Sequence, residues 1–584
     1  MARPETAPEV SKAAEADRPP RFSVILPVWH PEPDHLRQCI ESVVGQTYDG
    51  WQLLIVADGP QPPAVTRVLA DFEPDPRVRV IRLDHNVGIG GASQAALEAA
   101  GEEFIALLDH DDVLSPHALG AFAAELALAA PVDLAYSDED KLEHGTGERK
   151  MPFYKPGFSM ERLRCQMYLG HLLVMRRTLA LEVGGFRGDY DGAQDHDLAL
   201  RVAEQARSVV HIPRILYHWR ESPASTALDT DSKEWAWEAG RMAVADHLRR
   251  TGFPAEAVAS PVARGVVDLE PRLVEHPLVS IIIPTGGTSR IINGAMTLLV
   301  ERAVSSLVER SSYPNVEIVV VLDASCDDAL VRRIAAAARR SVPVVLLRDG
   351  RPFNFADACN IGAVRSNGEV LIFLNDDTEV RMANWIERLV MYATRPDIGA
   401  VGVKLLYGDG RVQHAGVWAR GGPAHRYVGF RGDHPGNFHA LRLAQNCLAV
   451  TAACLAVGRD RFDEVGGFSS RYPLAYNDVD LCFKLLQKGY RNVVDCATEV
   501  VHHESSSRDP TVREWEIDLL RKRWRPLLMS DPFDNPANLA AGVDEYPSTP
   551  VDIVERKAAR GELVLAGRRW PDRDFYNLGG RWHG

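Results

Sequence analysis

Short apolar runs alternate along the chain with segments in which apolar residues recur at helical spacing. Phe22–Val28 (FSVILPV) is a mostly apolar run of strand length, and Asp34–Tyr48 places Leu36, Ile40 and Val43 on one helix face. Further strand-like runs follow at Gln52–Ala57, Val78–Leu83 and Phe104–Leu108. Strands buried on both faces have such continuous apolar runs, and their alternation with helices predicts an α/β fold with a mostly parallel, doubly wound sheet.

Three carboxylates, Asp109, Asp111 and Asp112, directly follow the strand predicted at Phe104–Leu108. The carboxyl ends of parallel strands are where open sheets bind ligands. Acids this close repel one another, and a divalent cation holding an anionic substrate would offset the repulsion. A solvated turn that caps a helix explains the stretch equally well, because Ser115-Pro116 is typical of a helix start.

The same order of strands and acids returns in the second half of the chain. The matching positions are Pro27 with Pro284, Asp58 with Asp323, Phe104–Leu114 with Val370–Val380, Asp195 with Asp478, and His218 with the pair His502-His503. The offset grows from 257 (284 minus 27) to 283 (478 minus 195), which predicts insertions at 286–296 and around 405–445. A period this long indicates two whole domains rather than a solenoid. A shared fold explains shared strands, but not the same acids at the same strand ends.

Other candidate residues have simpler explanations. The glycines 88, 90 and 91 do not have the GxGxxG spacing and do not follow the first strand, so a glycine turn near a helix start is favoured over an NAD site. Asp195 precedes a helical pattern and could be a helix cap, and a lone histidine such as His218 is usually structural. The acidic segment Tyr136–Lys141, which contains Asp138, follows a short apolar run.

Composition excludes several classes of protein. The 584 residues suffice for two or more domains, and the net charge of -14 argues against nucleic-acid binding. The eight cysteines are scattered singly, so neither a disulfide framework nor a zinc site is indicated. Residues 1–20 lack the apolar core of a signal peptide, and no apolar run reaches the roughly 18 residues that span a bilayer, so we expect a cytoplasmic protein.

The expected organisation is two α/β domains with terminal extensions. We predict a disordered segment at 1–20, a first domain at 21–255, a linker at 256–277, a second domain at 278–530 and a tail at 531–584. Residues 513–528 have the pattern of an amphipathic helix with basic flanks. Such a helix could rest on an anionic membrane surface, but docking on the second domain is favoured.

Specific motifs in both halves resemble family 2 glycosyltransferases, inverting enzymes of the GT-A fold, and in particular the tandem, rhamnosyltransferase-like proteins that build bacterial surface polysaccharides. The resemblance covers about residues 21–240 and 278–530. The first half contains SVILPV, YSDEDK, KPGFS, GGF, GAQDHDLALR and LYHWR. The second contains PFNFADACNIGA, FLNDDTEV, QHAGV, VTAACLAV, GGF, YNDVDLCFKL and HHESSSR.

This resemblance implies a nucleotide-sugar donor, a divalent metal (Mg or Mn) and a glycan acceptor. Carried onto the first half, it implies that Pro27, Asp58, Asp109 and Asp138 contact the donor, that Asp111 and His218 lie at the metal and diphosphate, and that Asp195 is the general base. The counterparts in the second half are Pro284, Asp323, Asn375 and Asp376 for the donor, Asp377, His502 and His503 for the metal, and Asp478 for the base. Asn375 departs from the family's Asp-x-Asp pattern. Ala57 and Leu322 replace an acid often found before the second-strand aspartate, so the nucleobase of the donor stays open between uracil and thymine.

The function that this resemblance implies is bifunctional transfer of sugars from dTDP- or UDP-sugars, such as dTDP-rhamnose, to a lipid-linked surface polysaccharide such as O-antigen. It also implies peripheral contact with the cytoplasmic face of the inner membrane or with other polysaccharide-synthesis proteins. Two alternatives stay open. One half, such as the second with Asn375, could be a silent acceptor-binding or scaffold domain. A sugar nucleotidyltransferase is disfavoured because PVWHPEPD lacks the glycine- and arginine-rich loop expected after the first strand.

Overall fold

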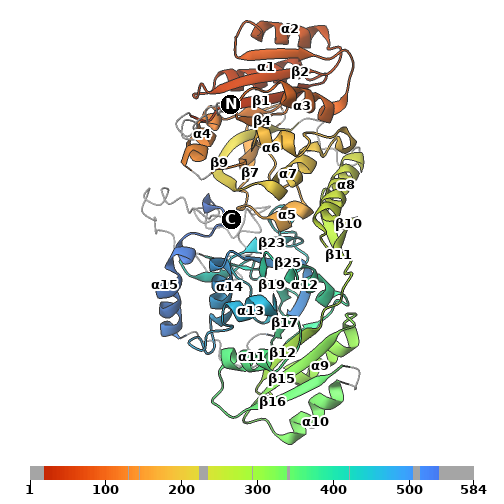
Figure 1. The fold of residues 1–584 in the computed structure, drawn as a ribbon, viewed down its shortest axis with the longest axis vertical. Helices are drawn as coiled ribbons and strands as arrows, with labels where there is room; N and C mark the ends of the chain where they lie inside the picture. Colours follow the sequence, from red (N-terminus) through yellow and green to blue (C-terminus); the bar gives the residue numbers. More distant parts are fainter. Residues whose placement is uncertain are drawn as a thin grey trace, which may run out of the picture. The chain divides into compact units, whose positions relative to one another are not determined.

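The computed structural model describes residues 19–128, 131–143, 145–221, 234–292, 294–338, 342–419, 421–503 and 513–537. The chain forms two compact units (Figure 1). Of the described residues, the first unit comprises 19–153 and 169–221, and the second comprises Tyr154–Tyr168 and the residues from 234 to 537. The predictions for residues 1–18 and 538–584 lie outside the described residues.

The first unit is built on a nine-stranded mixed sheet with the order β3-β2-β1-β4-β8-β6-β9-β5, and β7 pairs with β6. The central strand β1 runs parallel to both β2 and β4, whereas β8 runs antiparallel to β4. The strands are β1 (Phe22–Val28), β2 (Trp51–Ala57), β3 (Val78–Arg82), β4 (Phe104–Leu107), β5 (Val113–Leu114), β6 (Leu134–Leu142), β7 (Arg149–Phe153), β8 (Leu173–Arg176) and β9 (Val209–Arg220).

Helices of the first unit bury their apolar stripes against this sheet. Pro33 opens α1 and Gly45 ends it, and the buried Leu36, Ile40 and Val43 of α1 belong to the same core as β1. The helices are α1 (Pro33–Val44), α2 (Pro63–Phe72), α3 (Gly88–Ala99), α4 (Ala118–Leu128), α6 (Arg177–Glu182) and α7 (Gln194–Gln205).

The second unit repeats the sheet strand for strand. Its order is β16-β15-β12-β17-β24-β19-β25-β18, so each strand has a counterpart at the same place in the first sheet. The strands are β12 (Val279–Thr285), β15 (Val316–Asp323), β16 (Val344–Asp349), β17 (Val370–Leu374), β18 (Thr378–Val380), β19 (Ile398–Leu406), β24 (Cys454–Gly458) and β25 (Arg491–His502). The flanking helices are α9 (Leu299–Arg310), α10 (Asp328–Ala337), α11 (Phe355–Val364), α12 (Trp385–Ala393), α13 (Arg459–Glu464) and α14 (Asn477–Gln487).

Additional elements of the second unit fall at both predicted insertions. The hairpin of β13 (Ser289–Ile292) and β14 (Ala295–Leu298) occupies the first insertion. The second insertion holds β20 (Val412–His414), β21 (Val417–Ala419), β22 (Pro423–His425) and β23 (Ala444–Cys447).

The division of the chain differs from the predicted boundaries at three places. The described residues from 234 to 255, predicted to end the first domain, belong to the second unit. The segment expected to be a linker contains the antiparallel strands β10 (Ala255–Ala259) and β11 (Val267–Pro271), which follow α8 (Glu234–Thr251). Residues 154–168, with α5 (Met160–Cys165), belong to the second unit although they interrupt the first. There Ser159 Oγ accepts a hydrogen bond from Asn446 N at 3.0 Å, and Lys155 O accepts one from Asn535 Nδ2 at 2.9 Å.

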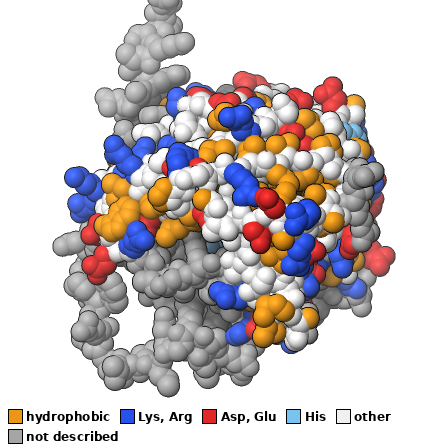
Figure 2. Space-filling view, turned by 90° about the horizontal axis from the view of Figure 1, so that it is seen from below, with side chains coloured by type: hydrophobic (Ala, Val, Ile, Leu, Met, Phe, Trp, Pro, Cys, Tyr) orange, Lys and Arg blue, Asp and Glu red, His pale blue; other side chains and the backbone are white. Residues whose placement is uncertain are grey.

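The predicted amphipathic helix is α15 (Glu514–Met529), and it docks on the second unit as favoured above. Leu520, Trp524, Leu527 and Leu528 are buried in the core of that unit. Among the described residues, no helix has both the length and the apolar character needed to cross a bilayer. On the face seen in Figure 2, basic side chains are interspersed with acidic and apolar ones.

Candidate active sites at the carboxyl ends of the two sheets

The acidic turn of the first unit lies between β4 and β5, at the edge of the sheet where β1, the parallel neighbour of β4, also ends. Asp112 is fully buried in this turn, and its carboxylate accepts hydrogen bonds from Arg220 N at 2.7 Å and from the Tyr217 hydroxyl at 2.5 Å. Burial, with the nearby charges of Asp111 and Asp109, raises the pKa of Asp112 well above its usual value. Asp112 therefore ties the turn to β9.

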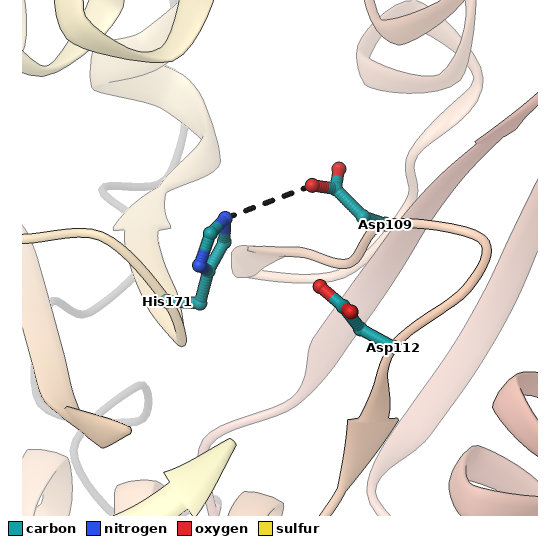
Figure 3. Close-up of side chains that lie close together, drawn as sticks. All are labelled: Asp109, Asp112 and His171. Carbon is teal, nitrogen blue, oxygen red and sulfur yellow. Dashed lines mark ion pairs between the residues drawn. The ribbon is translucent and has the colours of Figure 1, made fainter. Parts of the chain in front are cut away.

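His171, from the segment that precedes β8, faces this turn (Figure 3). Its Nε2 lies 3.6 Å from Asp109 Oδ2, its Nδ1 lies 3.3 Å from Glu139 Oε2, and its ring stacks on Tyr217. Burial alone would favour the neutral ring, but Glu139 and the acidic turn raise the pKa of His171 to about 9. Asp109, Asp112 and His171 each offer one ligand atom, all within 4.8 Å of one another, so this group could hold a metal ion.

Asp111 and Asp195 both lie near Asp109. Burial raises the pKa of Asp109, and the charges of Asp111 and Asp195 raise it further, although His171 opposes the shift. Asp195 is the second residue of α7, is half-buried and accepts a hydrogen bond from His196 N. The structure thus brings the predicted base and the predicted metal ligand to the same acidic turn.

His218 and Asp138 are not brought to this turn. Side chains alternate along β9, and Tyr217 and Trp219 face His171, so His218 points to the opposite face. Its Nδ1 lies 2.6 Å from Asp140 Oδ1. Asp138 is buried against His211, with 2.8 Å between Oδ1 and Nε2. The neighbouring Glu139, rather than Asp138, reaches His171.

Pro27 and Asp58 lie at the carboxyl ends of the paired strands β1 and β2. The buried Asp58 carboxylate accepts hydrogen bonds from Val87 N at 2.7 Å and from Asn86 Nδ2 at 2.9 Å, and so holds the loop before α3. The glycine turn there meets a carboxylate of the protein itself, because Gly90 N donates to Asp191 Oδ1 at 2.8 Å. A Cβ on Gly88 would lie only 2.0 Å from Asp191 Oδ2, which explains the glycine.

In the second unit, the turn after β17 carries Asn375, Asp376 and Asp377. Thr285 Oγ1 donates to Asp376 Oδ2 at 2.6 Å, and burial, with the charge of Asp377, raises the pKa of Asp376 to about 7. His502 Nε2 lies 3.0 Å from Asp377 Oδ1 and 3.1 Å from Asn375 Nδ2. His502 Nδ1 lies 2.7 Å from the Gln413 side-chain oxygen, a contact that orients the ring so that Nε2 faces the turn.

The strand registers correct one predicted correspondence. In the first unit Val113 pairs with His218, and in the second the equivalent Glu379 pairs with Val501. Val501 therefore takes the place of His218, and His502 takes that of Trp219, so the predicted match of His502-His503 with His218 is wrong by one residue. His503 lies beside Glu379, with 3.5 Å between Nε2 and Oε2, and only His502 reaches Asp377 and Asn375 through its ring.

Asp478 is connected to the acidic turn through one short segment. Its Oδ2 accepts a hydrogen bond from Ala452 N at 3.0 Å, and the next residue, Ala453, accepts one through its carbonyl from Asn375 N at 3.1 Å. Asp323 accepts hydrogen bonds from Ser325 N and Oγ. It lines a small pocket with the ends of β15 and β16 and the start of α11; the other lining residues are Val321, Leu322, Asp349, Arg351, Phe353, Asn354 and Ala358. Pro284, buried on β12, pairs with Val321 of that lining.

The acids two residues after each predicted base are structural. Asp197 is fully buried and pairs with Arg201 at 2.5 Å and with Arg187. Asp480 is likewise fully buried, with 2.8 Å to Trp524 Nε1 and 3.1 Å to the Arg523 guanidinium. In each unit the helix start therefore carries two aspartates: Asp195 or Asp478 near the acidic turn, and Asp197 or Asp480, which holds the helix in place.

A protein-family comparison identifies both units. The family model described as Glycosyl transferase family 2 matches residues 23–184 and 280–460. The chain belongs to this family. The family membership confirms the resemblance seen in the motifs, and together with the repeated sheet order it confirms two tandem GT-A domains.

This family 2 chain has relatives over most of its length. It is 40% identical over 565 residues to the uncharacterized protein y4gI of Sinorhizobium fredii, covering 94% of this chain and 59% of that protein. It is 35% identical over 538 residues to the O-antigen biosynthesis protein RfbC of Myxococcus xanthus, covering 90% of this chain and 40% of that protein. The chain thus spans about half the length of these relatives.

A solved structure of S. aureus TarS 1-349 in complex with UDP-GlcNAc is 18% identical, with a TM-score of 0.34, and covers 39% of this chain and 66% of that one. A likeness at this level supports no conclusion about the ligands of this chain.

His171, Glu139 and Gln413 are site residues that the sequence patterns did not reveal. His171 belongs to no acidic motif, and it reaches Asp109 because β8 runs antiparallel to β4. Glu139 was visible within the acidic segment beside Asp138, but a register irregularity between β6 and β9 decides which of the two faces the turn. Gln413 lies in QHAGV, a motif for which the sequence suggested no role.

Proposed function

We propose that this chain is a bifunctional, metal-dependent, inverting glycosyltransferase. Each unit transfers one sugar from a dTDP- or UDP-sugar, with dTDP-rhamnose as the first candidate, to a lipid-linked bacterial surface polysaccharide such as O-antigen. Membership of family 2 and the similarity to RfbC support this proposal. The observation that carries it is that each sheet places an aspartate at a helix start, Asp195 or Asp478, beside an acidic turn at the end of its central parallel strands.

The donor is held at the carboxyl end of each sheet. Pro27 and Asp58 in the first unit, and Pro284 and Asp323 in the second, line the nucleoside side, with Asp109, Asn375 and Asp376 as the further donor contacts. Asp323 makes its hydrogen bonds to the neighbouring Ser325, whereas Asp58 holds the loop before α3.

The acidic turns fit a divalent cation, Mg or Mn. Carboxylate oxygens and an imidazole nitrogen are suitable ligands for Mn, and Mg prefers oxygen ligands. In the first unit Asp111 would hold the ion with the group formed by Asp109, Asp112 and His171. In the second unit Asp377 Oδ1 and His502 Nε2 lie 3.0 Å apart and would be the ligands, with the Gln413 contact orienting the ring. When bound, the cation would neutralise charge that develops on the diphosphate leaving group.

The chain's own contribution to the reaction is a positioned base. The acceptor hydroxyl oxygen forms a bond to the anomeric carbon as the bond from that carbon to the diphosphate breaks. The hydroxyl proton passes to the carboxylate of Asp195 or Asp478, which typically contributes about 10²–10⁴-fold. A single displacement with no covalent intermediate inverts the anomeric centre and needs no second carboxylate nucleophile.

A second candidate is that only the first unit transfers sugar and the second binds the acceptor. The observation in its favour is that Asn375, Thr378 and Ala453 occupy the places of Asp109, Asp112 and His171. For either function we propose the cytoplasmic face of the inner membrane as the location, with other polysaccharide-synthesis proteins as partners.

The full-length chain with Asp195→Asn, with Asp478→Asn and with both substitutions tests the proposal. Release of nucleoside diphosphate is measured from dTDP-rhamnose, UDP-glucose and UDP-GlcNAc, with and without EDTA followed by Mn or Mg. We expect each single variant to lose one donor activity, the double variant to lose both, and EDTA to stop what remains. Wild-type rates in both single variants would refute the base assignment, full activity in EDTA would refute the metal, and loss through Asp195→Asn alone would favour the acceptor-binding second unit.

A further inference from the structure

The helix α15 contacts the chain on both sides of Asp478. On one side, Glu516 Oε1 accepts hydrogen bonds from Ala475 N at 3.1 Å and from Leu474 N at 3.4 Å. On the other side, Trp524 Nε1 donates to Asp480 Oδ1 at 2.8 Å. Glu516 is 1% exposed and Asp480 is 0% exposed, so these contacts are shielded from water.

Between these two contacts the backbone takes an uncommon conformation. Tyr476, the residue before α14, has φ 61° and ψ 7°, in the left-handed region that residues other than glycine rarely adopt. A residue in this region keeps its conformation only where its surroundings hold it. Asp478 is the second residue of α14, so the orientation of its carboxylate depends on how Tyr476 is held.

The first unit holds the corresponding loop by different means. Asp191, three residues before α7, accepts a hydrogen bond from Gly90 N at the start of α3. Ala193, at the place of Tyr476, has φ -145°, outside the left-handed region. Asp197, the counterpart of Asp480, is held by Arg187 and Arg201 of its own unit. Within the described residues, the first unit has no helix in the role of α15.

We propose that α15 positions the base of the second unit, with Glu516 as a positioning residue that sets Asp478 through residues 474–476 and with Trp524 fixing the other side through Asp480. This inference rests on the proposed role of Asp478. It makes the second transfer step dependent on a helix that lies outside both segments matched by the family model, whereas the first step is independent of it.

Kinetics of the full-length chain carrying Asp195→Asn, which isolates the second unit, provide the first test. We expect Glu516→Ala to lower kcat for dTDP release from dTDP-rhamnose, or for UDP release from UDP-glucose, at least tenfold with the donor KM within twofold. Glu516→Gln should stay within threefold of the parent, because its Oε1 still accepts both backbone hydrogen bonds. Trp524→Phe, which keeps the ring packing but loses the donor to Asp480, should fall between the two. The control is Asp518→Ala on the exposed side of the same helix, with 73% of its side chain exposed.

Hydrogen exchange of the same variants provides a second test that does not require a donor. The amides of Leu474 and Ala475 should exchange faster in Glu516→Ala than in the parent, and at the parental rate in Glu516→Gln and Asp518→Ala. Unchanged exchange and unchanged kcat in Glu516→Ala would overturn the proposal. The proposal would also be overturned if kcat fell in Glu516→Ala and stayed equally low in Glu516→Gln. A fall in kcat together with an equal change in KM and a loss of protection from exchange throughout the unit would overturn it as well.

The two proposals can fail separately. If Asp478→Asn leaves transfer unchanged while Glu516→Ala still frees the two amides and lowers kcat, the base assignment fails and α15 positions another group. If Asp478→Asn abolishes transfer while Glu516→Ala changes neither quantity, the base stands and the role of α15 fails.

Discussion

The two units share a sheet order but fill equivalent places with different chemistry. In the first, Asp109 and Glu139 lie on either side of His171. In the second, the place of Asp109 is taken by Asn375 and that of His171 by Ala453, and the imidazole comes instead from His502 on β25. Each turn therefore has an imidazole beside it, supplied by the segment before β8 in the first unit and by β25 in the second.

The largest difference that we predict concerns Asp197 and Asp480, the buried acids two residues after the proposed bases. Asp197→Asn should destabilise the first unit by about 3–5 kcal/mol, because it leaves the buried Arg201 guanidinium without a carboxylate. Asp480→Asn should cost the second unit less, because Asn Oδ1 still accepts from Trp524 and the Arg523 side chain is 42% exposed. Hydrogen exchange as a function of urea, followed on peptides of each unit, gives the two free energies of unfolding. Equal losses would show that the two acids have the same role.

The next prediction separates the two imidazoles. His502→Ala should lower the transfer rate of the second unit about 100-fold, equivalent to about 2.7 kcal/mol of transition-state stabilisation, because one of the two facing ligand atoms is lost. Mn binding, measured from the EPR signal of free Mn, should lose one site. The controls His218→Ala and Trp219→Ala in the first unit should keep both Mn sites, and loss of a site in His218→Ala would reinstate that residue as a ligand.

A pH prediction follows from Asp376. Its pKa is about 7 in the folded unit against an ordinary value of 3.8, so the buried carboxyl keeps its proton over a range in which the unfolded chain has lost it. The stabilisation is complete below pH 3.8 and is lost as the pH rises through 7. Asp376→Asn imitates the neutral form and retains an acceptor for Thr285. Relative to the wild type, it should stabilise the second unit more at pH 8 than at pH 5, by a further amount on the order of 2–3 kcal/mol, because the wild type loses stability over this range.

Urea unfolding of Asp376→Asn in EDTA, at both pH values, measures this effect without a bound cation. The same stabilisation at pH 5 and pH 8 would show that packing, rather than the charge, is responsible.

The smallest predicted difference concerns the second-strand acids. Asp58→Asn should cost the first unit about 1 kcal/mol, because its buried carboxylate accepts from both Val87 N and Asn86 Nδ2 and an amide cannot accept from both. Asp323→Asn should change stability by less than about 0.5 kcal/mol, as expected for a site that is not buried, and instead raise the donor KM of the second unit. Urea denaturation and donor KM, measured on both variants, distinguish a structural role from donor binding. A rise in KM confined to Asp58→Asn would show that Asp58, rather than Asp323, contacts the donor.

The sequence predicts the sheet well because its strands are buried on both faces. The predicted bounds Phe22–Val28 are those of β1, and the positions matched in the repeat fall on or directly after the strand pairs β1 and β12, β2 and β15, and β4 and β17. Both predicted insertions contain additional strands.

The details of the sites depend on information that a linear pattern lacks. His171 reaches Asp109 through an antiparallel neighbour of β4, and antiparallel pairing cannot be recognised from the order of the apolar runs. His218 and His502 differ by one position in strand register, and a shift of one residue turns a side chain to the opposite face. The distinction between Asp138 and Glu139 likewise depends on a local irregularity between β6 and β9.

Residues 154–168 have a consequence for anyone who wishes to separate the two activities. A fragment that starts at the repeat boundary, near residue 278, would lack Lys155, Ser159 and Glu161, and so would lose bonding partners of Asn535, Asn446 and Arg491. A first-half fragment would carry these same residues with their normal partners missing. The two activities are therefore best separated by point mutations in the intact polypeptide. A gene divided between the repeats would encode two damaged products rather than two enzymes.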